Sequence, residues 1–124
     1  ALAKSASLKN LEEIILNKND IKDKGLQHLA VSKNFAKLKS LKAGDVSIGD
    51  LAVKTLVLSQ NLKNLEELRL NGNSITREGL DFLQDTPNLC ALKKIDLRRN
   101  QFLYEDCIFL SDSPRFKNLK VVRF

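Results

Sequence analysis

The stretch LRLNGNSITREGL, residues 68–80, changes its apolar spacing partway along. Leu68 and Leu70 flank a polar residue, as in a strand, but the apolar residues that follow fit neither the two-residue period of a strand nor the 3.6-residue period of a helix. A single secondary-structure element therefore does not explain the stretch. We interpret it as a strand, a corner and the start of a helix in succession.

The pattern of this stretch recurs along the chain at a step of 27 residues. The first leucines of the copies are Leu11, Leu38, Leu65, Leu92 and Leu119. A second column at the same step contains Ile14, Leu41, Leu68, Ile95 and Val122. Repetition at a fixed period of this length, without insertions, is typical of solenoids, in which stacked copies share one continuous core. The chain is therefore predicted to be a repeat array.

Each copy is expected to contain a strand, a corner and a helix. In the third copy Leu68 and Leu70 should point into the core, while Arg69 points to solvent. Asn73 ends this strand, where its side-chain amide can bond the turning backbone, and Asn19 and Asn100 should act likewise. The spacing predicts a helix that starts within Thr76 to Gly79, and further helices near residues 23–32, 50–59 and 104–111.

The second copy departs from this pattern. Ala43 replaces leucine, Val46 replaces asparagine and Ala52 replaces glycine. Its core is expected to be smaller. Because its corner lacks the amide that the other copies carry, we predict a locally looser turn there.

The repeats have the form L-x-x-L-x-L-x-x-N-x-I followed by G-L-x-x-L, and they resemble leucine-rich repeats of the ribonuclease-inhibitor-like type over essentially the whole chain. The resemblance implies an α/β leucine-rich-repeat solenoid, a right-handed β-α superhelix with a parallel inner sheet of about five strands and outer helices. Residues 1–124 would form a single leucine-rich-repeat domain, either a slice of a longer array or a short version of one. Such repeats occur in inhibitors, innate-immune sensors, GTPase-activating proteins and bacterial effectors, so the surface must indicate the function.

Composition favours a globular protein that does not span a membrane. Of 124 residues, 43% are hydrophobic and 29% are charged, and no run of 18 apolar residues occurs. Two cysteines are too few for a disulfide scaffold, which indicates a reducing compartment. We therefore expect a cytoplasmic location, or delivery into a cytosol. The abundance of lysine and asparagine also suits a bacterial effector.

The sequence contains no motif that predicts catalysis. It lacks a glycine-rich phosphate loop, a paired-cysteine zinc spacing and a nucleophile motif, so we expect no enzyme activity, no cofactor and no metal. His28, the only histidine, is expected to lie exposed on a helix. Cys107 occupies a leucine column and should be a small buried apolar residue, whereas Cys90 lies in a loop and should be partly exposed.

The outward side chains of the strands should form one concave face, which is the predicted partner-binding surface. Its formal charge by copy runs −2, +1, −1, +3 and +2, so the face becomes basic toward its C-terminal end. The predicted partner-binding residues are Glu13, Ile15, Lys42, Glu67, Arg69, Asn71, Lys94, Asp96, Arg98, Arg99 and Arg123.

We expect this face to bind another protein through an acidic patch, because arginine forms paired hydrogen bonds with carboxylates. Five strands at ~4.8 Å spacing give a face of about 400 Å², against roughly 800 Å² per partner in a standard interface. This face alone should therefore bind weakly, or loops, helices or further repeats should add to the contact. An alternative is a structural spacer or capping segment of a larger protein. Separately, the uncapped ends could allow the chain to self-associate. Nucleic-acid binding is disfavoured because the face lacks aromatic stacking residues.

Overall fold

The computed structural model describes residues 10–86 and 88–124 of the chain. Strands and helices alternate along it, as predicted for an α/β solenoid. In chain order the elements are β1 (Glu13–Ile15), α1 (Lys22–Val31), η3 (Lys33–Phe35), β2 (Ser40–Lys42), α2 (Asp50–Leu58), η4 (Gln60–Leu62), β3 (Glu67–Arg69), α3 (Arg77–Gln84), β4 (Lys94–Asp96), η5 (Tyr104–Cys107), α4 (Phe109–Asp112), η6 (Pro114–Phe116) and β5 (Val121–Arg123), where η denotes a 3-10 helix.

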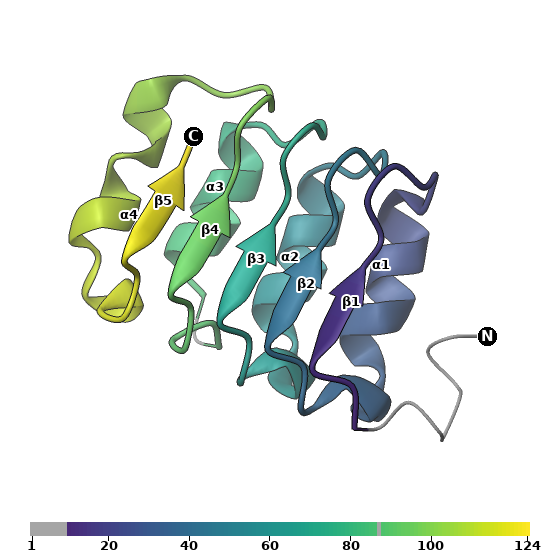
Figure 1. Cartoon of the computed structure of the whole chain (residues 1–124). Helices are drawn as coiled ribbons and strands as arrows, with labels where there is room; N and C mark the ends of the chain where they lie inside the picture. The colour runs from purple at the N-terminus through teal and green to yellow at the C-terminus, as the bar shows by residue number, and fades with distance from the viewer. Residues whose placement is uncertain (1–9, 87) are drawn as a thin grey trace.

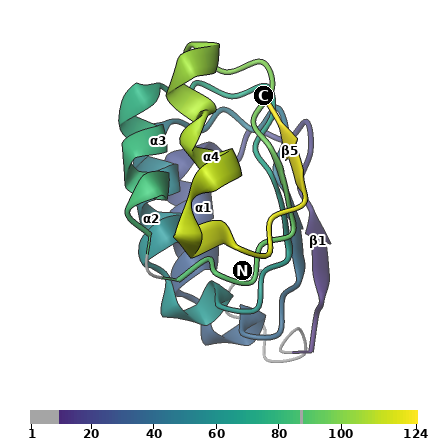
Figure 2. The ribbon, with the colours of Figure 1, turned by 90° about the vertical axis from the view of Figure 1, so that its left-hand side faces the viewer.

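The five strands form one parallel sheet in the order β1-β2-β3-β4-β5 (Figure 1). Its register follows the sequence repeat, since Leu41 pairs with Leu68 and Leu68 pairs with Ile95. Backbone bonding continues past the strand bounds, because the Lys18 N–H donates to the Gly44 carbonyl at 2.9 Å. The helices cover one face of the sheet and leave the other open (Figure 2). The predicted parallel inner sheet with outer helices is confirmed.

The core lies between the sheet and the helices and consists of the repeated apolar columns. Leu68 and Leu70 are 1% and 0% exposed, which confirms that they point inward. From the helical side, Leu80 and Leu83 are buried on α3 in the same cluster. The buried residues of successive copies belong to one cluster, so the copies stack into one continuous hydrophobic core.

The predicted helices at residues 23–32 and 50–59 are confirmed to within one residue at each end as α1 and α2. In the third copy Thr76 caps α3, because its hydroxyl accepts a hydrogen bond from the Glu78 N–H at 3.3 Å. The Asp50 carboxylate also accepts from the N–H groups of Thr76 and Gly79, at 2.8 and 3.0 Å. The start of α3 is therefore bonded to the start of α2.

The single helix predicted at residues 104–111 is wrong. The segment forms the 3-10 helix η5 followed by the four-residue helix α4. Asp106 takes the position that glycine holds in the first and third copies. Its carboxylate accepts from the Leu103 N–H, and its own N–H donates to the Leu103 carbonyl, both at 3.0 Å. This three-residue hydrogen-bonding step closes a 3-10 turn in place of an α-helical turn.

The missing amide of the second copy is supplied by the third. The Asn73 side-chain carbonyl accepts from the N–H groups of Val46 and Ile48, at 3.1 and 3.3 Å. Its amide nitrogen donates to the carbonyls of Ala43 and Leu70, both at 2.9 Å. The premise of the predicted looser turn, a corner without a bonding amide, is therefore wrong.

Candidate functional site

The predicted partner-binding residues come together on the open face of the sheet. Within the strands they occupy outward positions, and Asn71, Arg98 and Arg99 follow the ends of β3 and β4. By strand, the in-sheet members are Glu13 and Ile15 on β1, Lys42 on β2, Glu67 and Arg69 on β3, Lys94 and Asp96 on β4, and Arg123 on β5. We call this surface the concave face.

Ion pairs neutralise much of the first three strands of the concave face. Lys42 pairs with Glu13 across β1 and β2 at 2.9 Å. The Lys42 hydrogen bond and charge hold the pKa of Glu13 below its ordinary value. Within β3, Arg69 pairs with Glu67 at 2.6 Å. These predicted contact residues are therefore already bonded to one another.

A second row of ion pairs lies just before the strands. Lys39 lies 3.8 Å from Glu12, and Lys93 lies 2.7 Å from Glu66. The hydrogen bond and charge of Lys93 lower the pKa of Glu66. Positive and negative side chains thus alternate over the first four copies along this edge.

Asp96 is buried, although the sequence predicted a contact residue on the open face. Its side chain is paired with Arg98, whose Nε and Nη2 donate at 3.0 and 2.7 Å and whose backbone N–H donates at 3.1 Å. Burial raises the pKa of Asp96, but the hydrogen bonds and charge of Arg98, with the charge of Arg123, bring it below the ordinary value. Asp96 therefore orients Arg98 and offers little surface itself.

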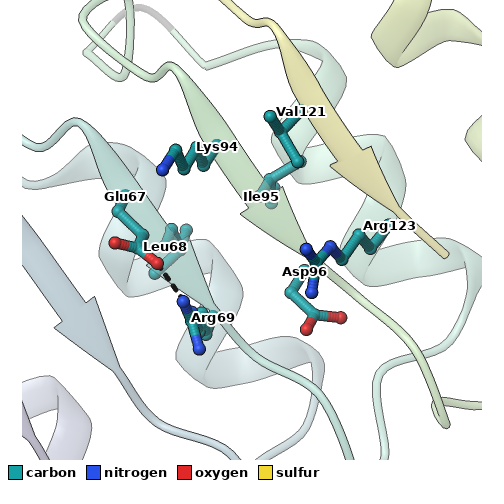
Figure 3. A pocket seen from close by; sticks show the side chains of 8 residues that line it. All are labelled: Glu67, Leu68, Arg69, Lys94, Ile95, Asp96, Val121 and Arg123. Atoms are coloured by element: carbon teal, nitrogen blue, oxygen red, sulfur yellow. Dashed lines mark hydrogen bonds and ion pairs between the residues drawn. The ribbon is translucent and has the colours of Figure 1, made fainter.

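A hollow of about 100 Å³ opens on the concave face across β3, β4 and β5 (Figure 3). Among the charged residues that line it, Lys94 and Arg123 make no side-chain hydrogen bond or ion pair within residues 10–86 and 88–124. Val121 is paired in register with Lys94 and supplies an apolar lining. The hollow therefore places two cations that make no ion pair with the described residues beside an apolar side chain.

Val121 is a lining residue that the predicted set of partner-binding residues did not include. A valine on a strand does not stand out by charge or by a motif. Its position could nevertheless have been found from the repeat, because Val121 lies 27 residues after Lys94 and residues one repeat apart meet on adjacent parallel strands.

The histidine and cysteine side chains, which could in principle be reactive, lie away from this face. His28 is exposed on α1, as predicted. Cys90 is exposed and Cys107 is buried, as predicted, and burial together with the charge of Asp106 raises the pKa of Cys107 to about 11. The part of the chain that the structure describes contains no group of three or more histidine, cysteine, aspartate or glutamate residues placed to hold a metal ion. It also contains no helix with the length and apolar content needed to cross a membrane.

Comparison with known proteins finds a sequence match at two of the repeats and solved structures with a similar fold. A family model described as "Leucine Rich repeat" matches residues 7–30 and 61–83. The solved structure of "Leiomodin-1 Actin-Binding Site 2 (ABS2)" is similar with a TM-score of 0.62 and 17% identity, over 94% of this chain and 73% of that chain. No curated protein sequence matches the chain.

An internalin from Listeria monocytogenes is similar with a TM-score of 0.53 and 23% identity. The match covers 96% of this chain but 36% of the internalin chain, so this chain spans about a third of that protein's length. The ribonuclease-inhibitor-like subtype stays a prediction from the sequence. The repeated columns, the parallel sheet with outer helices and these likenesses show an α/β leucine-rich-repeat solenoid, and the leucine-rich repeat model matches two of its repeats.

Proposed function

We propose that the chain is a protein-binding module that contacts an acidic segment of its partner with the C-terminal end of the concave face, from β3 to β5. The observation that carries this proposal is the pair of cations at the hollow, Lys94 and Arg123, which have no ion-pair partner among the described residues. Elsewhere on the face, Lys42 and Arg69 are paired with glutamates of the same sheet. Positive charge is therefore available to a partner mainly at this end.

The chemistry of the hollow suits a carboxylate on a short aliphatic stem. Arg123 offers a planar fork of donors that matches a carboxylate, and Lys94 adds a compact positive charge. Val121 supplies an apolar contact for the methylene groups of a glutamate side chain. The similar leiomodin-1 structure is an actin-binding site, which agrees with a protein as the partner.

Three competing functions have less support. Nucleic acid binding without base specificity usually relies on aromatic stacking platforms, and none of the outward strand residues is aromatic. In a structural spacer, the cations Lys94 and Arg123 at the hollow would have no function, because a spacer needs no exposed binding surface. The chain's cysteine positions and lack of a catalytic motif give no basis for proposing an enzyme.

The test is capture of partners from a lysate of the source organism by immobilised chain, compared with a double variant, Lys94→Glu and Arg123→Glu. The control is Lys63→Glu with Lys117→Glu, which makes the same charge change at two exposed residues of one repeat column away from the hollow. We expect a defined acidic protein to be retained by the wild type and the control and lost with the test variant. Equal retention by all three would reject the proposed surface.

Arg98 is left unchanged in this test for a structural reason. A glutamate at position 98 would place a second carboxylate against the buried Asp96, which now has Arg98 as its partner. Loss of binding in such a variant would not separate a lost contact from a damaged fold. Neither Lys94 nor Arg123 hydrogen-bonds Asp96, and Arg123 acts on it only through its charge. Circular dichroism of the double variant therefore checks that the fold is retained.

A further inference from the structure

The outer helices present three parallel stripes of different chemistry to solvent. α2 lies between α1 and α3, with direct contacts to both (Figure 1). Residues three, four or seven apart on a helix share one face. The stripes are Lys24, His28 and Val31 on α1, Leu51, Lys54 and Leu58 on α2, and Glu78 and Asp81 on α3 together with Asp85 at its C-cap.

The stripe on α2 and its border with α3 are unusually apolar for a solvent-facing surface. Leu51 and Leu58 are 52% and 59% exposed, and Val31 on the neighbouring helix is 68% exposed. A hollow of about 160 Å³ lies beside them and is lined by Lys54, Val57, Leu58, Phe82, Asp85 and Thr86. Exposed apolar side chains gathered next to a hollow are typical of an interaction surface.

Charge differs between the two sides of this apolar stripe. On α1, Lys24 is exposed, and the nearby carboxylate of Asp23 is directed to the Gly49 N–H at 2.8 Å. Along α3 and its C-cap, the exposed stripe consists of three carboxylates. The helical face is therefore cationic on one side, apolar in the centre and anionic on the other.

We propose that this helical face binds a second copy of the chain, related by a two-fold axis that runs parallel to α2. Such an axis places α1 of each copy over α3 of the other and α2 over α2. Lys24, Leu51 and Glu78 occupy equivalent positions in successive copies, so they lie at the same level along the helices. Lys24 of each copy would then face Glu78 of its partner, and the leucines of α2 would meet at the centre.

The hollow beside α2 receives a side chain in this arrangement. Val31 lies at the level of Leu58 and Asp85, so the Val31 of one copy is brought to the border between α2 and α3 of the other. A valine side chain is small enough for a hollow of about 160 Å³. Lys54, which would otherwise approach its own counterpart, lies toward α3, with its Nζ 5.6 Å from the centre of the Phe82 ring.

The alternative two-fold axis, perpendicular to the helices within the same plane, is disfavoured by charge. It would place α3 of one copy over α3 of the other and bring the three carboxylates of each together. The charge pattern therefore selects the parallel axis. Three helices about 10 Å apart and about 13 Å long offer on the order of 400 Å², half of a standard interface side, so the dimer should be weak.

The test is sedimentation equilibrium of the whole chain from about 10 µM to about 1 mM, a range suited to a weak dimer. We expect a concentration-dependent dimer. Val31→Asp, an exposed change that leaves the core intact, should weaken dimerisation roughly tenfold or more, since it puts a charge into the apolar hollow and beside Asp85. The concave-face variant Lys94→Glu with Arg123→Glu should dimerise like the wild type.

A charge-exchange experiment tests the axis itself. Lys24→Glu alone and Glu78→Lys alone should each weaken self-association, because each creates two like-charge contacts per dimer. An equal mixture of the two single variants should form a heterodimer, because Lys24 then faces Glu78 in one contact and the two exchanged residues face each other in the other. The double variant in one chain should also recover dimerisation.

Three results would overturn the proposal. A chain that is monomeric throughout the concentration range has no such interface. A dimer that is insensitive to Val31→Asp uses another surface. A dimer sensitive to both single charge changes but not recovered in the mixture has a different axis. Because the concave-face variant is measured alongside, failure of this proposal is distinguished from failure of the proposed partner-binding function.

Discussion

Arg99 and Asp45, which are 54 residues apart in the sequence, form an ion pair of 3.1 Å that passes over Gly72. The three residues occupy the same corner position in consecutive copies, and all have positive φ, of 57°, 55° and 69° respectively. A Cβ atom on Gly72 would lie 2.0 Å from Asp45 Oδ1 and 3.1 Å from Arg99 Nη2. The glycine therefore lets the second and fourth copies bond directly across the third.

We predict that Gly72→Ala destabilises the chain by about 1 to 2 kcal/mol, because alanine is strained in the left-handed region. The clash with Asp45 adds to this effect and should open the ion pair. The measurement is urea unfolding followed by circular dichroism, with the midpoint and slope compared with those of the wild type.

The control for this change is Arg99→Ala, which removes the ion pair without altering Gly72. The pair is largely exposed, with side-chain exposures of 66% and 36%, so its loss should have little effect on the free energy of unfolding. Equal destabilisation by the two substitutions would show that the ion pair, and not the backbone conformation, makes Gly72 necessary.

Asn73 should be the most important corner residue for stability. It is 8% exposed, and its side chain bonds the backbone of both its own copy and the preceding one. Asn73→Ala leaves several buried N–H and carbonyl groups without partners, so we expect a loss of about 2 to 4 kcal/mol in the free energy of unfolding. The measurement is again denaturant unfolding.

Asn19 is the matched comparison, because it is exposed and, within residues 10–86 and 88–124, its side chain bonds only the Leu16 and Asn17 carbonyls of its own copy. Asn19→Ala should cost clearly less than Asn73→Ala. Hydrogen exchange provides a second readout, in which the amides of Val46 and Ile48 should lose protection in Asn73→Ala. An unchanged exchange rate at both amides would contradict the assigned role of Asn73.

The sheet and core were predictable because they depend on periodicity alone. A step of 27 residues without insertion makes Leu41, Leu68 and Ile95 neighbours on adjacent strands, which is the observed register. Alternation then determines which side chains face the core, as the burial of Leu68 and Leu70 shows. These features require only that equivalent residues stack.

Side-chain partners were not predictable in the same way, because they depend on rotamers and on neighbouring copies. Nothing in the spacing indicates that Arg98 turns to Asp96, or that Asn73 serves the corner containing Val46. A column of hydroxyls was also overlooked, in which Ser59 donates to the Ala30 carbonyl and Thr86 donates to the Val57 carbonyl at 2.9 Å. The predicted set of partner-binding residues thus combined cations available to a partner with cations already paired.

Stability should fall in acid because folding lowers the pKa of Asp96, Glu13 and Glu66. A carboxyl with a lower pKa in the folded state stabilises the fold above its unfolded-state pKa, near 4, and loses this effect as the pH falls through the folded-state value. We therefore expect these groups to leave the free energy of unfolding unchanged between pH 7 and pH 6. Below about pH 5 the free energy of unfolding should decline. Urea unfolding at a series of pH values measures it.

Asp96→Asn isolates the contribution of the buried carboxyl. The variant should be less stable at neutral pH, where the bonds between Arg98 and a carboxylate are lost, and its stability should decline less steeply in acid. If the Asp96→Asn variant loses stability in acid as steeply as the wild type, the pKa of Asp96 does not change on folding.

The two cysteines should differ in their reaction with a thiol reagent. Cys90 is exposed, whereas Cys107 is 0% exposed with its pKa raised to about 11, so only about one Cys107 in a thousand is a thiolate at pH 8. Mass spectrometry after brief iodoacetamide treatment should find one adduct, on Cys90, in the folded chain and two in denaturant. Equal modification of both cysteines in the folded chain would contradict the burial of Cys107.

The central claim, that the hollow between Lys94 and Arg123 binds an acidic segment, is tested most directly by NMR titration of the labelled chain with a glutamate-rich peptide. We predict amide shifts concentrated at Lys94, Val121 and Arg123, and their loss in the variant Lys94→Glu with Arg123→Glu. Comparable shifts at the exposed lysines of the helical face, Lys24 and Lys54, or shifts that persist in the variant, would contradict the claim.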